Sequence, residues 1–442
     1  MANKSKVSYI CSNCGASFNV WTGRCSICST WNSLEPVLNK PEGTKSSKLD
    51  VETSVSFQER DLKRLKLQDQ SLNNIFGGGI VPGSVSLIAG APGIGKSTLL
   101  LALIKDVEPK VKFLYVSAEE SLDQVYLRAN RLKLNYKNLF IANSNSTNEI
   151  INTIQSKQYD LIVVDSIQTI SLDEINTSRG SITQISASAN LIIEAAKASN
   201  VAVIIVGHIT KDGYIAGPKV LEHLVDTVFQ FEGDRFSNLK FLRATKNRFG
   251  SINEVIIYEM VDDGLRLVNS PSELLLQERM KTDGSIVHAT LEGSRAILVE
   301  IQSLVSKTQY GYPKRATSGF DLNRLNLLIA MLEKRTKLRF SDQDIYLNVV
   351  GGINLKDPSA DLAVCMSLAS SLTNKVLTKD YVIAGEVGLS GEIRHIPYLV
   401  TRYEESIKLG FAGFIGPKDK SLTKSNYFPC NDVRTTLIEY LK

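Results

Sequence analysis

The 442-residue sequence has no long apolar run, little net charge and few cysteines. No stretch approaches the roughly 18 apolar residues that cross a bilayer, and the N-terminal segment lacks the apolar core of a signal peptide. We therefore expect a cytoplasmic protein with no membrane partner. The net charge is only +5, from 51 basic and 46 acidic residues, so composition neither requires nor excludes a polyanionic partner. Hydrophobic residues make up 43% of the chain, which is typical of an ordinary globular protein. A length of 442 residues predicts two to four domains.

Four of the 6 cysteines fall in the first 28 residues as two C-x-x-C pairs, Cys11 with Cys14 and Cys25 with Cys28. Two such pairs are typical of a closed tetrahedral Zn²⁺ site in a segment too short to fold on a hydrophobic core. Iron–sulfur ligation is the alternative that the spacing leaves open. We expect a four-cysteine zinc finger over residues 1–35 and a polar, turn-rich linker over residues 36–57.

After residue 58, apolar strand-like segments alternate with helical ones, and helices are expected over 121–132, 148–156 and 181–199. This alternation predicts a parallel sheet with helices on both faces, and the closer spacing of the later strands predicts antiparallel pairing at one edge. We expect this α/β domain over residues 58–271 and a second α/β domain over residues 272–442.

A phosphate-binding loop stands between a predicted strand and a predicted helix. Its sequence matches G-x-x-x-x-G-K-[ST] and consists of Gly90, Ala91, Pro92, Gly93, Ile94, Gly95, Lys96, Ser97 and Thr98. Glycines let backbone N–H groups surround a phosphate, while Lys96 would contact the β- and γ-phosphates and Ser97 would bind Mg²⁺. Asp165 ends another apolar strand and would reach the same sheet edge, either as a Mg²⁺ ligand through water or as the cap of a turn. ATP and Mg²⁺ are therefore the predicted ligands.

Two adjacent carboxylates, Glu119 and Glu120, end the strand that follows the loop. Either could polarise the water that attacks the γ-phosphate. We favour Glu119, because an acid at the position of Glu120 suits the start of the next helix. His208 ends a further core strand, where it is either a phosphate sensor or a structural histidine.

Lys246 and Arg248 follow the predicted strand 238–244. Side chains at i and i+2 of an extended segment point the same way, so both could face one anion. The hypothesis is an arginine-finger pair that completes the active site of a neighbouring protomer, which requires an oligomer. The alternative is a solvated, basic strand end.

Together these motifs resemble the RadA (Sms) family of bacterial DNA-repair proteins over the whole chain. The resemblance rests on the cysteine pairs, the phosphate loop, the segment after Gly207 and the pentapeptide Lys246-Asn-Arg-Phe-Gly250. It implies a RecA-like P-loop ATPase that forms a hexameric ring similar to replicative helicases. It further implies binding of single-stranded and branched DNA, and branch migration alongside the RecA recombinase. Where the family pattern places an arginine, this chain has Ser186, so Arg179 and Lys211 become the candidate DNA contacts.

The C-terminal domain is similar to the proteolytic domain of Lon. Ser359 matches the catalytic serine of Lon, but Val400 stands where Lon has its catalytic lysine. A serine without a nearby base is a poor nucleophile, so we expect no peptidase activity and a helix-capping role for Ser359. The alternatives are an ATP-dependent Lon-like protease and a signalling ATPase of the KaiC type, which shares the phosphate loop and the paired glutamates.

Overall fold

The computed structural model describes residues 7–11, 17–18, 22–31, 34–38, 63–134, 136–208, 220–233, 238–309 and 311–442. The chain divides into two compact units, Met1–Leu62 and Lys63–Lys442. Within these described ranges, no helix combines the length and the apolar character needed to span a membrane.

The first unit is a small antiparallel sheet in the order β2-β1-β3. Its strands are β1 (Val7–Cys11), β2 (Ser17–Phe18) and β3 (Leu34–Leu38). The strand β3 therefore continues past residue 35, where the linker was predicted to begin. Among the described residues of this unit, the buried cluster consists of Cys11, Cys25 and Leu34, with Phe18 and Cys28 packed against it. Cysteines thus lie at the centre of this unit, as in small folds that a structural metal stabilises.

The second unit opens with a nine-stranded sheet in the order β12-β11-β10-β9-β4-β8-β7-β5-β6. Its parallel strands are β4 (Val85–Gly90), β5 (Phe113–Ser117), β6 (Leu139–Asn143), β7 (Leu161–Asp165), β8 (Ala202–His208) and β9 (Thr227–Glu232). The strands β10 (Leu239–Asn247), β11 (Val255–Val261) and β12 (Gly264–Leu267) extend one edge in antiparallel fashion. The predicted combination of a parallel core with an antiparallel edge is confirmed.

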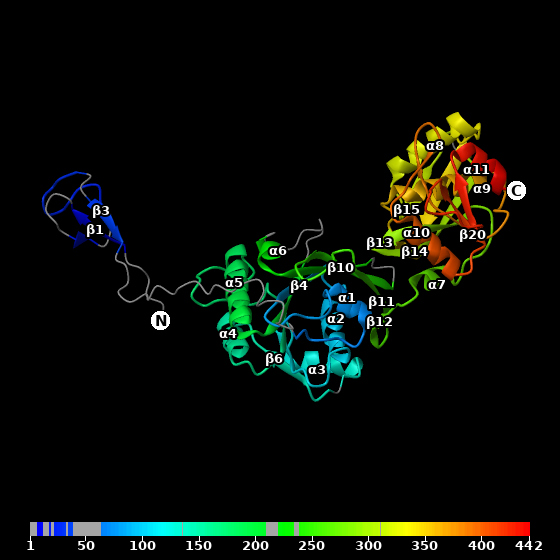
Figure 1. Ribbon diagram of the computed structural model, residues 1–442. Helices are drawn as coiled ribbons and strands as arrows, with labels where there is room; N and C mark the ends of the chain where they lie inside the picture. Colours follow the sequence, from blue (N-terminus) through cyan, green and yellow to red (C-terminus); the bar gives the residue numbers. More distant parts are fainter. Residues whose placement is uncertain are drawn as a thin grey trace. The chain divides into compact units, whose positions relative to one another are not determined.

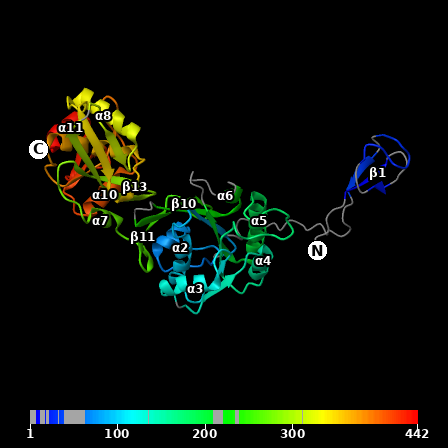
Figure 2. The same cartoon turned by 180° about the vertical axis from the view of Figure 1, so that it is seen from behind.

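Helices cover both faces of this sheet (Figures 1 and 2). One face packs against α1 (Gln70–Ile75), α2 (Lys96–Ala102) and α3 (Leu122–Arg131), and the other against α4 (Thr147–Gln155), α5 (Ile182–Ser199) and α6 (Val220–Leu224). Successive side chains of each strand point to opposite faces of the sheet, so each strand contributes to both apolar layers. In β7, Val163 packs into the first layer, while Ile162 and Val164 pack into the second.

The carboxyl ends of the parallel strands meet at one edge because their registers align. Ser117 pairs with Asp165 across β5 and β7, and Gly90 pairs with His208 across β4 and β8. Four polar or loop-forming positions that are far apart in the sequence therefore lie side by side at this edge.

The C-terminal part of the second unit contains a seven-stranded sheet in the order β15-β16-β14-β13-β17-β20-β21. Its strands are β13 (Ser285–Glu292), β14 (Arg295–Lys307), β15 (Arg315–Ser318), β16 (Gln343–Val349), β17 (Tyr381–Ile383), β20 (Gly413–Pro417) and β21 (Tyr427–Cys430). A separate hairpin joins β18 (Glu386–Val387) to β19 (Ile393–Arg394). The core on one face is formed with α8 (Leu322–Thr336), α9 (Asp361–Thr373) and α11 (Val433–Tyr440), and on the other with α10 (Leu399–Lys408), while α7 (Pro271–Leu276) leads into the sheet.

The helix-capping role predicted for Ser359 is wrong. The short 3-10 helix Pro358–Ala360 is capped by Asp357, whose side chain accepts the N–H of Ser359 at 3.0 Å. Pro358 begins the turn with its fixed φ, so the cap falls two residues before Ser359. The serine is fully buried, and its Oγ donates to Asp357 Oδ2 at 2.7 Å and accepts from Arg402 Nη1 at 2.8 Å.

Arg402, whose importance the sequence did not indicate, holds this part of the domain together. Its guanidinium is fully buried and also donates to the carboxylate of Asp357 and to the backbone oxygens of Ala289 and Pro397. Burial alone would raise the pKa of Asp357, but the Ser359 N–H and the charge of Arg402 outweigh it and hold that pKa below its ordinary value.

We expect Arg402→Ala to lower the free energy of unfolding of the full chain by about 3 kcal/mol, because it leaves a partly buried carboxylate without its cation. Ser359→Ala is the matched control. It removes the hydroxyl's bonds to two charged groups but leaves Asp357 and Arg402 paired with each other, so it should cost less, about 1.5 kcal/mol. Urea unfolding monitored by circular dichroism measures both. Equal losses in the two variants would show that Arg402 is not the residue that holds the cluster.

The ion pair between Asp357 and Arg402 should also make the free energy of unfolding depend on pH in the acidic range. A depressed Asp357 pKa stabilises the folded chain above the unfolded pKa of about 4, and that stabilisation disappears as the pH falls through the folded value. Arg402→Ala should therefore lose less stability than the wild type between pH 5 and pH 3. A parallel decline of both proteins would contradict the assignment.

Candidate active site

The phosphate loop joins the end of β4 to the start of α2, and its backbone conformation requires glycine. Gly93 and Gly95 have φ values of 76° and 109°, a left-handed region that is unfavourable for other residues. A Cβ on Gly95 would also lie 2.9 Å from the Met260 Cε atom. Residues 91–93 are exposed, so the backbone of the loop is accessible to a ligand.

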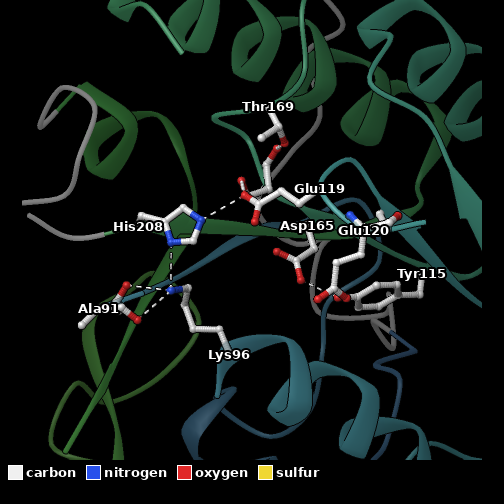
Figure 3. A network of polar contacts seen from close by, with 11 residues as sticks. Ala91, Lys96, Tyr115, Glu119, Glu120, Asp165, Thr169 and His208 are labelled. Carbon is white, nitrogen blue, oxygen red and sulfur yellow. Dashed lines mark hydrogen bonds and ion pairs between the residues drawn. The ribbon is translucent and has the colours of Figure 1, made fainter. Parts of the chain in front are cut away.

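Lys96 is 5% exposed and lies along this loop. Its Nζ donates to the backbone oxygens of Gly90 at 2.7 Å and Ala91 at 3.0 Å, and it lies 3.2 Å from His208 Nδ1 (Figure 3). Burial lowers the pKa of Lys96 to about 8, although the nearby carboxylates Asp165 and Glu119 partly oppose the shift. The ammonium group therefore has little water around it and is held by groups that a phosphate can replace.

His208 connects Lys96 to Glu119. Its Nε2 lies 3.1 Å from Glu119 Oε1 (Figure 3). Because an ammonium group can only donate, Nδ1 of His208 accepts from Lys96 and Nε2 carries the hydrogen donated to Glu119. Glu119 also accepts a hydrogen bond from the Ser166 hydroxyl. The His208 hydrogen bond is the main cause that lowers the pKa of Glu119 to about 2, so this carboxylate is ionised at neutral pH.

Glu120 occupies a different environment from its neighbour. Its carboxylate forms an ion pair with Arg128 of α3, and its N–H donates to Ser117 Oγ at 2.9 Å. The structure thus separates the two glutamates that the sequence left in competition. Of the two, Glu119 is the one hydrogen-bonded to His208, and its catalytic role stays a prediction.

Tyr115 is a site residue that sequence reasoning missed. Its hydroxyl donates to Oδ2 of Asp165, one of the predicted Mg²⁺ ligands. Burial raises the pKa of Tyr115 well above its ordinary value. One signal was available, because a tyrosine in the middle of a buried, mostly apolar strand needs a partner for its hydroxyl.

Lys246 and Arg248 lie beside the turn between α6 and β9. The strand β10 continues to Asn247, so Lys246 stands within the strand, after a bulge next to Ala244. Its Nζ donates to the backbone oxygens of residues 222, 223 and 225 at 2.7, 3.1 and 2.8 Å. Arg248 Nη1 contacts Asp226 Oδ1 at 3.1 Å. Both side chains therefore contact the same turn, and their common role toward one anion stays a prediction.

Three predicted residues remain to be placed. Arg179 is exposed on the segment between β7 and α5. Cys14 and Lys211 lie outside the described residues.

The remaining cysteines of the first unit fit a metal site. The Sγ atoms of Cys11, Cys25 and Cys28 all lie within 4.8 Å of one another, and those of Cys11 and Cys28 are 3.6 Å apart. Tetrahedral Zn²⁺ with bonds of about 2.3 Å separates its sulfurs by roughly 3.8 Å. Three thiolates at this separation suit zinc, with Cys14 as the predicted fourth ligand.

Family models match three parts of the chain. Residues 9–36 match a rubredoxin metal binding domain, residues 52–214 match an AAA domain, and residues 324–420 match the subunit ChlI of Mg-chelatase. With the geometry above, these matches define the class: a P-loop ATPase with an N-terminal zinc ribbon and a C-terminal Lon-like α/β domain. The predicted fold class is confirmed.

Curated relatives resemble the chain over nearly its whole length. Each carries the name DNA repair protein RadA, and the identity is 44% over 420 residues for Aquifex aeolicus (94% of both chains), 42% over 425 residues for Chlamydia trachomatis (94% and 93%) and 41% over 446 residues for Listeria monocytogenes (99% and 96%). The chain therefore belongs to the RadA family. A solved ATPase domain of another protein aligns with 49% of this chain and 95% of its own length, at 14% identity and a TM-score of 0.41, which is too low to argue from.

Elemental analysis of the purified full chain should find one zinc ion per chain, since a closed site of this geometry holds one metal. Cys11→Ser or Cys28→Ser should lose the zinc, whereas Cys430→Ser, in the C-terminal sheet, should retain it. Iron with visible charge-transfer absorption would instead support the iron–sulfur alternative.

Proposed function

We propose that this chain is a DNA-dependent ATPase of recombinational DNA repair. It works as a hexameric ring that binds single-stranded and branched DNA and, together with the RecA recombinase, extends recombination intermediates by branch migration. The observation that carries the proposal is the continuous polar chain from Lys96 through His208 to Glu119 beside Asp165. It links the groups that would contact ATP to the end of β8, and thus to the segment that follows His208.

The residues around the phosphate loop have separate roles in the proposed hydrolysis. Bound MgATP supplies the phosphoanhydride that is cleaved. Lys96 turns from the carbonyl oxygens of the loop to the β- and γ-phosphates, and Ser97 and Asp165 hold the cation. Glu119 orients the attacking water, and its low pKa keeps it ionised as an acceptor of hydrogen bonds from that water.

The link to mechanical work runs through His208 in this proposal. When Lys96 turns to the phosphates, His208 loses one of its two hydrogen-bond partners. His208 is the last residue of β8, so in this proposal it is the described residue that senses the nucleotide nearest in sequence to Lys211. Lys211, one of the two candidate DNA contacts, lies outside the described residues.

DNA as the substrate is supported by family membership, since the relatives are named DNA repair proteins. A purely proteolytic role is disfavoured by the surroundings of Ser359. Its hydroxyl is fully buried between two charged neighbours. Arg402, which donates to it, stays protonated, and Asp357, which accepts from it, has a lowered pKa and is therefore a weak base. The C-terminal domain therefore serves as a scaffold in this proposal.

Glu119→Gln should lower the rate of ATP hydrolysis at least about a hundredfold while leaving ATP binding intact, because it removes the acceptor that orients water. Glu120→Gln is the matched control and should retain most activity. Steady-state hydrolysis with and without single-stranded DNA, together with binding of a fluorescent nucleotide, measures these effects. The wild type should be stimulated by the DNA.

Two results would contradict this set of roles. A severe loss of ATP hydrolysis in Glu120→Gln with a mild loss in Glu119→Gln would mean that Glu120, and not Glu119, orients the attacking water. Hydrolysis that is indifferent to DNA at low salt would count against the proposed substrate, since phosphate contacts are strongest under those conditions.

Subunit mixing tests whether Lys246 and Arg248 act on a neighbouring protomer. Lys96→Ala and Arg248→Ala chains should each be inactive alone, since the first lacks the phosphate ligand and the second lacks the transition-state cation. Mixed, they should recover part of the wild-type activity wherever an intact loop meets an intact arginine. No recovery at any ratio would mean that the arginine acts within its own chain.

A further inference from the structure

We propose that Asp226 is a positioning residue that orients Arg248 toward the active site of the neighbouring protomer. The inference rests on the trans role of Arg248 proposed above. It assigns a function to the turn between α6 and β9, which none of the sequence motifs indicated.

The carboxylate of Asp226 is oriented independently of Arg248. The backbone N–H of Asp226 donates to the Val85 oxygen at 2.9 Å, and its Oδ2 accepts the Val85 N–H at 3.0 Å. Val85 is the first residue of β4, the strand that ends in the phosphate loop. Two bonds to one residue fix both the backbone and the side chain of Asp226, which leaves Oδ1 directed toward Arg248.

The carboxylate needs a cation, because its side chain is only 8% exposed and an unpaired buried charge is costly. Arg248 supplies that cation through Nη1, which lies 3.1 Å from Oδ1 of Asp226. The backbone N–H of Arg248 also donates to the backbone oxygen of Asp226 at 3.2 Å. These two bonds set the direction in which the arginine leaves the strand end.

Arg248 is nevertheless not buried by this contact. Its side chain remains 52% exposed. A guanidinium carries five N–H donors in a rigid plane, and one is used by Asp226, so the others can meet a second anion without breaking the pair. An exposed, pre-oriented guanidinium is the form that a trans-acting cation requires.

Lys246 has the complementary role. An ammonium group has three donors, and three backbone oxygens of the same turn accept from it. Lys246 therefore fastens the end of β10 to the turn, while Arg248 is the cation with donors still available. Together Asp226 and Lys246 would hold the strand end so that Arg248 projects in one direction.

The competing interpretation is that Asp226 supports the phosphate loop of its own chain through Val85. Subunit mixing separates the two. A Lys96→Ala chain cannot hydrolyse ATP itself, but it can supply Arg248 to its neighbour. A second substitution in that chain therefore changes the ATPase activity of the mixture only if it affects the supplied arginine. Asp226→Asn is the informative substitution, because Val85 and Arg248 bond different carboxylate oxygens, and the amide keeps an acceptor at only one of these two positions.

We expect Lys96→Ala/Asp226→Asn chains, mixed with Arg248→Ala chains, to restore at least about tenfold less ATPase activity than Lys96→Ala chains do, given the large rate contribution of a trans arginine. In the reverse arrangement, Asp226→Asn/Arg248→Ala chains mixed with Lys96→Ala chains should be rescued normally. Lys96→Ala/Glu254→Gln chains are the charge-matched control and should rescue fully, since Glu254 lies in the segment between β10 and β11 and its carboxylate has no ion pair in the described part of the chain.

Equal rescue by Lys96→Ala and Lys96→Ala/Asp226→Asn chains, with unchanged melting temperature and assembly state, overturns the proposal. Loss of rescue only when Asp226→Asn is on the Arg248→Ala chain also overturns it and assigns Asp226 to its own loop. If the parent mixture of Lys96→Ala with Arg248→Ala shows no activity, the trans mechanism itself has failed, which is a separate outcome from failure of the Asp226 assignment.

Discussion

Hydrogen bonding between neighbouring parallel strands sets the position of every group in the candidate site. The pairing of β4 with β8 brings Gly90 to His208, and the pairing of β5 with β7 brings Ser117 to Asp165. A slip of one residue in any of these pairs would turn the terminal side chain to the opposite face of the sheet. The buried layers on both faces prevent such a slip, so the hydrophobic core specifies the geometry of the polar edge.

The elements of the fold could be predicted from the sequence because they depend on local patterns. Short apolar runs predicted the parallel strands, and the glycine-rich loop between strand and helix predicted the position of Lys96. Parallel strands bring their carboxyl ends to one edge of a sheet, which explains why Lys96, Asp165 and Glu119 were expected there, although strand order and register were not predicted. The phosphate loop in particular is a local structure, dictated by residues that are adjacent in the chain.

The residues that were missed act through contacts between distant segments. Tyr115 donates to Asp165, Arg402 reaches back to Asp357, and Asp226 is held by Val85, 141 residues earlier. Nothing in the local pattern around these residues shows which partner they meet. Ser359 illustrates the opposite error: its local context suggested a cap, but a neighbouring aspartate before a proline took that position.

The buried guanidinium in the C-terminal domain ties the surroundings of Ser359 to the integrity of the fold. Arg402 serves four acceptors, on Asp357, Ser359, Ala289 and Pro397, with donors held in a rigid plane. A lysine at the same position has one nitrogen and three donors, so at least one buried acceptor would be left unsatisfied. Even a substitution that keeps the positive charge would therefore destabilise the domain, so arginine is the residue that this cluster requires.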